Sequence, residues 1–394
     1  MNGVLMVNPE LVRTGEETFW DVAEGREIRL GPALTSLVLQ FAVPSTVDAV
    51  ISGLKVTNAA ATVASAVAEL VTRRVLVHHE TRAPDNGRAA GLFRSPVLSV
   101  AEALGGEVAD AVVLGMPYDV AVTYRPGTRF GPEYLRRVSG SLFQYKVVDG
   151  LPRGMHDPVR GHRVLEGVRL ADIGNITGTV FTRNGSGFDA LKQIMSRLAA
   201  ASRFPVLLGG DHSITLPAVQ GMLSAYPRLG VLHIDAHADY AVARTDDWRE
   251  DCHHGNFMSW IVGDERVEKI AQFGIRQLTE EETYTPDKVS RWPGTTASGA
   301  VTDVLAALPE DLPYYLTIDV DGLDPATMPA TGTPLPGGFG APQLIALLEA
   351  VCAERRLVGM DVVELQSDTA DGPGLVAAEI VLRVLDAVLG RGRR

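Results

Sequence analysis

The sequence is poor in cysteine and has no long apolar stretch, and these absences exclude several classes of protein. It holds 2 cysteines in 394 residues, Cys252 and Cys352, so neither a disulfide scaffold nor a cysteine-based zinc site is expected. No apolar run approaches the roughly 18 residues that a membrane span requires. The first ten residues lack the basic and apolar regions of a secretion signal. We therefore expect a cytoplasmic protein without a membrane partner.

Positive charge is also scarce. The chain carries 36 Lys and Arg against 48 Asp and Glu, a formal net charge of -12. An acidic surface repels the phosphate backbone, so nucleic acid is not an expected partner. The hydrophobic content of 46% is sufficient for a substantial core. Part of the negative charge falls in tight clusters of aspartate, which bound cations would offset.

Residues 1–80 are expected to form a small module of their own. Two short β-favouring segments, separated by a turn near Gly25, predict a hairpin. Helices are predicted after Ser45, which is suited to cap one of them, and over Thr62–Arg73. A strand is expected at 74–77. This order of elements predicts a winged-helix-like α+β module.

The predicted module resembles the small peptide-binding domains typified by the chaperone of pyrroloquinoline quinone biosynthesis. Segments such as NPELVRTGEETFWDV and FAVPSTVDAVISGL carry the resemblance, which covers only the first fifth of the chain. It implies that the module grips a leader peptide or a partner strand by edge pairing. The alternative is a structural or oligomerisation cap. DNA binding is disfavoured because the module offers no concentrated basic recognition helix.

Residues 81–108 are rich in polar residues, glycine and proline, which predicts a linker. In residues 109–394, apolar strands alternate with helical segments. The strand candidates are Ala111–Gly115, Pro205–Leu208, Gly230–Ile234, Tyr315–Val320 and Leu357–Val363, with helices such as Gly187–Ala200 and Ala341–Arg355 between them. This alternation predicts the α/β class, with a mainly parallel sheet and helices on both faces.

Three of the predicted strands end in segments with potential metal ligands: LLGGDHS, HIDAHAD and TIDVDGLDP. Side chains two residues apart in an extended segment lie on the same face, and ligands bind at the carboxyl ends of strands in such sheets. The six candidates are His212, Asp235, His237, Asp239, Asp319 and Asp321. They include too many carboxylates for one compact ion but suit two ions that share bridging carboxylates.

These segments are similar to the signatures of the arginase, agmatinase and ureohydrolase superfamily. The matching stretches are GGDHS, DAHAD and DVDGLDPATMPATGTPLPGG, and LGMPYDVAVTYRPGTRFGPEYLR resembles the opening of the agmatinase-like branch. The resemblance implies an arginase-like three-layer α/β/α fold, two Mn²⁺ ions and a homo-oligomer, either a trimer or a hexamer. It also implies one ion on His212, Asp235, Asp239 and Asp319 and the other on Asp235, His237, Asp319 and Asp321.

The reaction that the resemblance implies is hydrolysis of a guanidino group to an amine and urea through a metal-bridging hydroxide. A guanidinium is a poor electrophile, so water must become hydroxide at neutral pH, and two cations achieve this by lowering its pKa. By the family pattern, Asp324 accepts a hydrogen bond from this hydroxide, whereas its place before Pro325 also suits a plain turn. His254, followed by Gly255, is expected to protonate the leaving amine, with His253 as the competitor.

Glu364 resembles the family glutamate that pairs with the substrate guanidinium; the alternative is a polar residue that merely ends an apolar strand. The chain departs from the family after Glu364, where Gln366-Ser367-Asp368 replaces an Asn-Pro pair. It also continues from Asp239 into the apolar stretch 240–243, which is poorly suited to hold the head group of free arginine. We therefore expect an agmatine-like compound, a guanidino acid or peptide-bound arginine as substrate.

Two other functions are compatible with the sequence. One is a metal-dependent enzyme of peptide natural-product maturation, which hydrolyses another amidine or amide or transfers a proton. The other is a non-catalytic peptide-binding protein on a ureohydrolase scaffold. Because all six metal ligands are present, a hydrolase acting on linear amidines is the leading hypothesis.

Overall fold

The computed structural model describes residues 3–8, 11–13, 16–21, 26–42, 44–54, 60–78, 90–106, 108–176, 184–241, 244–280 and 285–390. The chain divides into two compact units, one of residues 1–88 with 99–102 and the other of 89–98 with 103–394. Three predicted segments lie outside the described residues: the turn near Gly25, residues 81–89 of the linker, and Val242-Ala243 of the apolar stretch.

The first unit combines two small antiparallel sheets with three helices. Its strands are β1 (Val4–Val7), β2 (Leu11–Arg13), β3 (Thr18–Asp21), β4 (Arg26–Arg29), β5 (Ser45–Thr46) and β6 (Leu76–His78), and its helices are α1 (Pro32–Leu39), α2 (Val47–Gly53) and α3 (Ala60–Thr72). The sheets have the orders β2-β3-β4 and β5-β1-β6. Phe19, Val38, Phe41 and Leu70 belong to a core of the unit's own.

Local chemistry explains where the first unit follows the expected elements and where it differs. β3 and β4 pair antiparallel, as a hairpin requires. The cap of α2 is Thr46 and not Ser45, since the Thr46 hydroxyl accepts from the Ala49 N–H. Helix α1 was not predicted. It begins at Pro32, and proline is favoured in a first turn, but its N-cap residue makes no side-chain hydrogen bond, so the usual start signal of a helix is absent.

The second unit is built on an eight-stranded sheet in which every neighbouring pair is parallel. Its strands are β7 (Ala111–Gly115), β12 (Leu170–Asn175), β13 (Phe204–Leu208), β14 (Leu229–Ile234), β15 (Val267–Phe273), β16 (Val289–Trp292), β17 (Tyr314–Asp319) and β18 (Leu357–Val363). Their spatial order is β12-β7-β13-β18-β17-β14-β15-β16. The four central strands β13, β18, β17 and β14 therefore come from three distant parts of the sequence.

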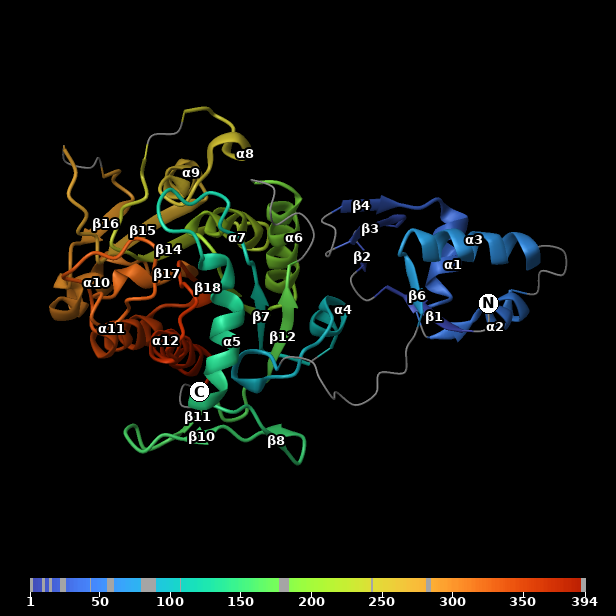
Figure 1. The fold of residues 1–394 in the computed structure, drawn as a ribbon, viewed down its shortest axis with the longest axis horizontal. Helices are drawn as coiled ribbons and strands as arrows, with labels where there is room; N and C mark the ends of the chain where they lie inside the picture. Colours follow the sequence, from blue (N-terminus) through green and yellow to red (C-terminus); the bar gives the residue numbers. More distant parts are fainter. Residues whose placement is uncertain are drawn as a thin grey trace. The chain divides into compact units, whose positions relative to one another are not determined.

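Helices cover both faces of this sheet (Figure 1). α5 (Gly131–Leu142), α11 (Ala341–Glu354) and α12 (Gly372–Leu389) group on one side, and α6 (Ser186–Ala200), α7 (Thr215–Met222) and α9 (Phe257–Gly263) on the other. The predicted three-layer α/β/α arrangement is confirmed. Shorter elements are α4 (Val100–Leu104), α8 (Trp248–Asp251), α10 (Val301–Ala307) and the strands β8 (Val147–Val148), β9 (Leu151–Pro152), β10 (Met155–His156) and β11 (Arg163–Val164).

Part of the segment expected as a linker contributes to the core of the second unit. Leu92 and Phe93 are fully buried there. The Leu92 N–H donates to Asp172, whose carboxylate also receives the guanidinium of Arg136 at 2.8 and 3.0 Å. A buried ion pair with these additional hydrogen bonds fixes the segment to β12. Among the described residues, no helix is both long and apolar enough to cross a membrane.

Candidate metal centre

The six predicted metal ligands lie at the carboxyl ends of β13, β14 and β17. His212 follows β13, while Asp319 ends β17 and Asp321 comes just after it. Asp235, His237 and Asp239 follow β14 directly. Because parallel strands all end at the same edge of the sheet, segments distant in the sequence are brought together at this point.

One cluster of carboxylates surrounds His212. Its Nδ1 atom lies 3.1 Å from Asp235 Oδ2, 3.4 Å from Asp239 Oδ2 and 3.2 Å from Asp319 Oδ2. His212 and Asp235 are fully buried, and Asp319 is nearly so. Three carboxylates around one ring nitrogen, away from water, form a site that requires a positive charge.

A second cluster shares Asp235 with the first. His237 Nδ1 lies 3.4 Å from Asp235 Oδ1 and 3.1 Å from Asp321 Oδ2. Asp235 thus presents one carboxylate oxygen to each cluster. Two sets of ligand atoms are close enough together to hold a metal ion, one from His212, His233, Asp235 and Asp239 and the other from Asp235, His237 and Asp321. Asp235 belongs to both sets, and a carboxylate in this position is the usual bridge of a two-metal site.

The proton positions around His212 fit a metal ion at Nδ1. Thr317 Oγ1 donates its single proton to Asp361 at 2.6 Å, so at 2.8 Å from His212 it accepts from the Nε2–H. The other nitrogen, Nδ1, makes no hydrogen bond of good geometry with the carboxylates that it faces. Burial opposes protonation of His212, but Asp235, Asp239 and Asp319 outweigh it and raise the pKa of that ring well above its ordinary value. A cation would displace the proton and bind Nδ1 together with the carboxylate oxygens, a donor set that suits several divalent ions.

The charges of the cluster are unbalanced without a cation. Burial, followed by the charges of Asp321 and Asp235, raises the pKa of Asp319 well above its ordinary value. Burial and Asp235 raise the pKa of Asp239 to about 6. Burial opposes protonation of His237, but Asp235 and Asp321 outweigh it and raise the pKa of that ring to about 12. Protons are therefore drawn to the positions that divalent ions would occupy.

Backbone geometry at the site is unusual in three places. Asp239 and Glu364 have φ values of 54° and 62°, in the left-handed region that non-glycine residues seldom adopt and that is enriched at functional sites. Gly210 admits no side chain, since a Cβ there would lie 1.7 Å from the Tyr118 carbonyl oxygen. This close approach lets the chain turn sharply and bring Asp211 and His212 into the site.

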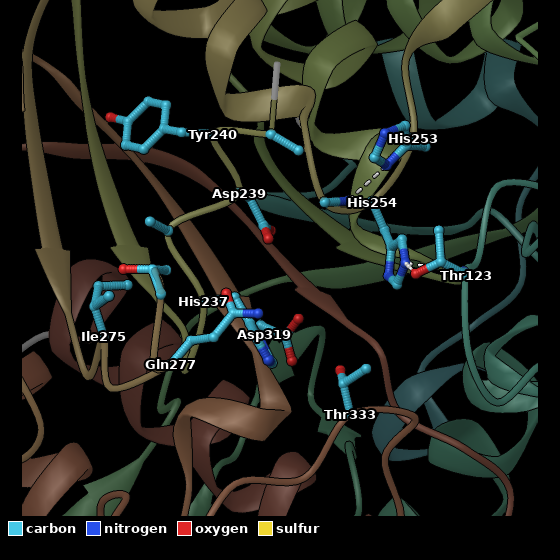
Figure 2. A pocket seen from close by; sticks show the side chains of 14 residues that line it. Thr123, His237, Asp239, Tyr240, His253, His254, Ile275, Gln277, Asp319 and Thr333 are labelled. Atoms are coloured by element: carbon cyan, nitrogen blue, oxygen red, sulfur yellow. Dashed lines mark hydrogen bonds between the residues drawn. The ribbon is translucent and has the colours of Figure 1, made fainter. Parts of the chain in front are cut away.

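A cavity of about 430 Å³ opens onto these ligands. Figure 2 shows His237, Asp239 and Asp319 near its centre, with Thr123 and His254 on one side and Ile275 and Gln277 on the other. Tyr240 and Ala241, from the apolar stretch noted in the sequence, also line it. The cavity is of the size that small-molecule sites usually have.

His254 has partners for both of its ring nitrogens. Its Nδ1 lies 3.3 Å from Glu364 Oε1, while its Nε2 lies 2.7 Å from the Thr123 hydroxyl and 3.0 Å from the Thr123 amide (Figure 2). Burial lowers the pKa of His254, but the hydrogen bond and charge of Glu364 outweigh burial and raise it to about 9. In the neutral ring, Nε2 accepts the N–H of Thr123. In the protonated ring, Nε2 carries a proton and can donate it to the Thr123 hydroxyl oxygen. Both protonation states of His254 therefore have a partner at Thr123.

The other candidate residues occupy different positions. His253 also lines the cavity, and its Nδ1 accepts from the Gly255 N–H at 3.1 Å. Glu364 is buried beside His254 and accepts from the His212 N–H at 2.9 Å, but it is not among the residues that line the cavity. Asp324 accepts from the N–H groups of Ala326 and Gly337 at 2.9 and 2.8 Å and belongs to neither cluster, as its alternative turn role requires.

Several residues of the site escaped the sequence analysis. His233 is fully buried and its Nε2 lies 2.7 Å from Asp235 Oδ2; its spacing of two before Asp235 was a usable signal. Phe257 packs on His212, with ring centroids 4.3 Å apart. Thr123 gave no signal, because it meets His254 from 131 positions away in the sequence.

An all-parallel α/β sheet with two histidine–carboxylate clusters sharing Asp235 at its carboxyl edge defines a protein with a candidate two-metal centre. Residues 109–386 match the arginase family. This match covers well over half of the chain, and the chain therefore belongs to the arginase family.

Relatives and solved structures agree with this membership. An agmatinase of Bacillus anthracis is 32% identical over 289 residues, which is 71% of this chain and 92% of that protein. A guanidinobutyrase of Pseudomonas aeruginosa is 29% identical over 328 residues, which is 79% of this chain and 96% of that protein. The structure of proclavaminate amidinohydrolase from Streptomyces clavuligerus is similar with a TM-score of 0.64 and 28% identity, covering 78% of this chain and 99% of that one. The family makes this chain a hydrolase of carbon–nitrogen bonds in linear amidines.

Proposed function

We propose that the protein is a manganese-dependent amidinohydrolase that converts a guanidino compound to an amine and urea. The observation that carries this proposal is Asp235, which offers one oxygen to the His212 cluster and the other to the His237 cluster. Three further residues of these clusters, His237, Asp239 and Asp319, line a cavity. A two-metal site of this kind suits hydrolysis of a poorly electrophilic carbon.

The residues divide between two metal positions. His212, Asp239 and one oxygen of Asp235 would hold the first ion, and His237, Asp321 and the other oxygen of Asp235 the second. Asp319, which lies 3.2 Å from His212 and lines the cavity, is the second proposed bridge. When bound, two such cations lower the pKa of a water molecule and supply a nucleophile at neutral pH. The oxygen-rich donor set and the family favour Mn²⁺.

Asp239 is better placed than Asp324 to orient the attacking water. Asp239 lines the cavity, and in Figure 2 its carboxylate points into the space between His237 and His254. Both oxygens of Asp324 already accept backbone N–H groups. We therefore propose that Asp239 replaces Asp324 in the role that the sequence analysis gave to Asp324.

We propose His254 as the acid that protonates the leaving amine. Its pKa of about 9 keeps a proton available at neutral pH. Because Thr123 covers Nε2, the proton passes from Nε2 to the Thr123 oxygen as the hydroxyl proton moves on to the amine. Glu364 orients His254 through the contact of its Oε1 with Nδ1, and its second carboxylate oxygen is the one proposed to contact the substrate guanidinium.

The substrate is proposed to be an agmatine-like compound, a guanidino acid or an arginine within a peptide. The names of the relatives, agmatinase, guanidinobutyrase and proclavaminate amidinohydrolase, support a small guanidino compound. Tyr240 and Ala241 line the cavity where a free amino acid would need polar groups. If the first unit binds a leader peptide, as its resemblance implies, peptide-bound arginine converted to ornithine is the favoured substrate.

Product masses test the proposed reaction. Manganese-loaded protein is incubated with agmatine, 4-guanidinobutyrate, free arginine and arginine-containing peptides. Loss of the mass that corresponds to urea release, with urea detected, supports an amidinohydrolase. Addition of water to a substrate without urea supports hydrolysis of another amidine or amide. An unchanged mass for the whole panel contradicts the proposal.

A further inference from the structure

A row of five polar side chains crosses the sheet next to the metal centre. The strand register aligns Asp361 of β18 with Thr317 of β17, and Thr317 with His233 of β14. It aligns His233 with Gln272 of β15, and Gln272 with Arg291 of β16. All of them except Arg291 are fully buried. Burying polar side chains inside an apolar sheet costs free energy unless each of them has a hydrogen-bond partner.

Arg291 fixes the orientation of Gln272. The Arg291 Nε and Nη2 atoms lie 3.0 and 2.8 Å from Gln272 Oε1, and a guanidinium can only donate. The amide nitrogen of Gln272 therefore faces the other way, where it donates to the Ala238 carbonyl at 3.1 Å and approaches His233 Nδ1 at 3.0 Å. A carbonyl can only accept, so both ends of Gln272 give the same orientation.

The orientation of Gln272 determines the tautomer of His233. Because Nδ1 of His233 accepts from Gln272, the proton of the neutral ring is on Nε2. That N–H donates to Asp235 Oδ2 at 2.7 Å. Distance alone would allow His233 to act as a metal ligand beside His212, but both of its ring nitrogens already have partners, Gln272 at Nδ1 and Asp235 at Nε2.

The opposite end of the row determines the tautomer of His212. Asp361 accepts the proton of Thr317 at 2.6 Å, and Thr317 in turn accepts the Nε2–H of His212 at 2.8 Å. Thr215 donates to the second oxygen of Asp361 at 3.0 Å and holds that carboxylate in place. Nε2 is thereby held as the donor to Thr317, and Nδ1, which faces the carboxylates of the first cluster, is the nitrogen left for a cation.

We infer that the row Asp361–Thr317–His233–Gln272–Arg291 is the outer support of the metal centre and that His233 is a positioning residue. At one end, Asp361 and Thr317 orient His212 so that its Nδ1 faces the first cluster. At the other end, Gln272 orients His233, which holds the shared carboxylate of Asp235 in a fixed rotamer. The inference rests on the metal centre of the proposed function. Outer partners of metal ligands typically contribute about 10- to 100-fold to metal affinity.

Calorimetric titration of the metal-free full-length protein with Mn²⁺, without substrate, tests this inference. His233→Phe keeps an aromatic ring but removes the donor to Asp235, whereas His233→Gln places an amide N–H near the former Nε2. Thr317→Val removes the acceptor for His212 with little change in shape, and Thr317→Ser restores a hydroxyl. We expect two ions per chain in all four variants, with affinity about 10- to 100-fold lower for Phe and Val and largely restored for Gln and Ser.

Two results would overturn the inference. Unchanged Mn²⁺ affinity in His233→Phe and Thr317→Val would show that the row only supports the fold. Loss of one ion per chain in His233→Phe, without recovery in His233→Gln, would make His233 a direct ligand. The thermal midpoint of each metal-free variant serves as the folding control. If His233→Phe does not fold, Gln272→Met provides the same comparison, with a smaller expected loss because His233 then holds either tautomer.

The outcome separates this inference from the proposed reaction. Wild-type protein that binds no Mn²⁺ overturns both. If the wild-type protein binds two ions and the variants change Mn²⁺ affinity as expected, the role of the row is supported. If the same protein releases no urea from any guanidino substrate, the proposed reaction is wrong.

Discussion

Asp235 lies between His212 and His237, with Oδ2 at 3.1 Å from Nδ1 of the first ring and Oδ1 at 3.4 Å from Nδ1 of the second. Each of the two rings also faces another aspartate, Asp319 for His212 and Asp321 for His237. Two cations satisfy all of these groups at once. The two rings follow different strands, His212 after β13 and His237 after β14. The order of strands in the sheet therefore determines the geometry of the proposed metal centre.

Substitution of Asp321 by asparagine should have opposite effects with and without metal. Burial and the charge of Asp235 raise the pKa of Asp321. A raised carboxyl pKa gives stability that is present below the unfolded value and lost as pH rises through the folded value. At neutral pH, Asp321→Asn should therefore increase the melting temperature of the metal-free protein.

With Mn²⁺ present, the same substitution should be harmful. The wild-type protein should gain about 2.7 kcal/mol of unfolding free energy for each bound ion at a metal concentration 100 times the Kd, and Asp321→Asn should lose most of the gain from the ion that Asp321 would hold. Differential scanning calorimetry with chelator and with Mn²⁺ measures both effects. A lower melting temperature of the variant in chelator would argue against charge repulsion in the cluster.

The ring of His254 should titrate near pH 9 in the metal-free protein. Glu364 raises the pKa of His254 to about 9 against the effect of burial, so the stability that this pair contributes is fully present below about 6.5 and is lost as pH rises through 9. NMR titration of the ring proton, assigned by its absence in His254→Asn, measures the value. Glu364→Gln should bring the midpoint back toward 6.5, and an unmoved midpoint would exclude Glu364 as the cause.

The hydroxyl of Thr123 should matter for turnover and not for substrate affinity. It lies 2.7 Å from His254 Nε2, on the proposed route of the proton. Thr123→Val should lower kcat by at least about tenfold with little change in KM, because a positioned acid–base path is interrupted. Thr123→Ser should retain the wild-type rate. Equal kcat values for the Val and Ser variants would remove Thr123 from the proton path.

Gly210 should tolerate no side chain. A Cβ at this position would lie 1.7 Å from the Tyr118 carbonyl oxygen, which is backbone and cannot rotate away. Gly210→Ala should destabilise the protein by about 3 kcal/mol or more. Gly372→Ala is the matched control, since a Cβ there meets nothing within 4 Å. Denaturant unfolding compares them, and similar stabilities of the two variants would contradict the packing around Gly210.

The ligand-bearing segments could be predicted from the sequence because each of them follows a buried strand. The spacing of two predicted a shared face of an extended segment, but β14 ends at Ile234, Asp239 has a φ of 54° and Asp321 lies in a short 3₁₀ helix. The loops that follow the strands, and not an extended face, bring these ligands together. The motifs predicted the arginase family and the alternation of strands and helices predicted the three-layer fold; the family match and the observed sheet confirm both.

The remaining parts depend on contacts that local sequence does not encode. β15 and β16 were not predicted, and in β15 Glu268 and Lys269 interrupt the apolar pattern; Gln272 and Arg291 were missed with these strands. Asp324 is suited either to orient the hydroxide or to form a turn, and its two backbone partners fit the turn; its catalytic role stays a prediction. Thr123 reaches His254 through tertiary folding alone.

The most direct measurement of the central claim is urea release as a function of bound Mn²⁺, with Asp235→Asn as the control. Metal-free protein is titrated with Mn²⁺ and assayed on the panel of agmatine, guanidino acids and arginine-containing peptides. We predict that urea appears with at least one substrate, that the rate reaches its plateau at two ions per chain, and that Asp235→Asn is inactive at the same metal concentration. No urea from any substrate at full metal loading, or an equal rate in Asp235→Asn, would contradict a two-metal amidinohydrolase.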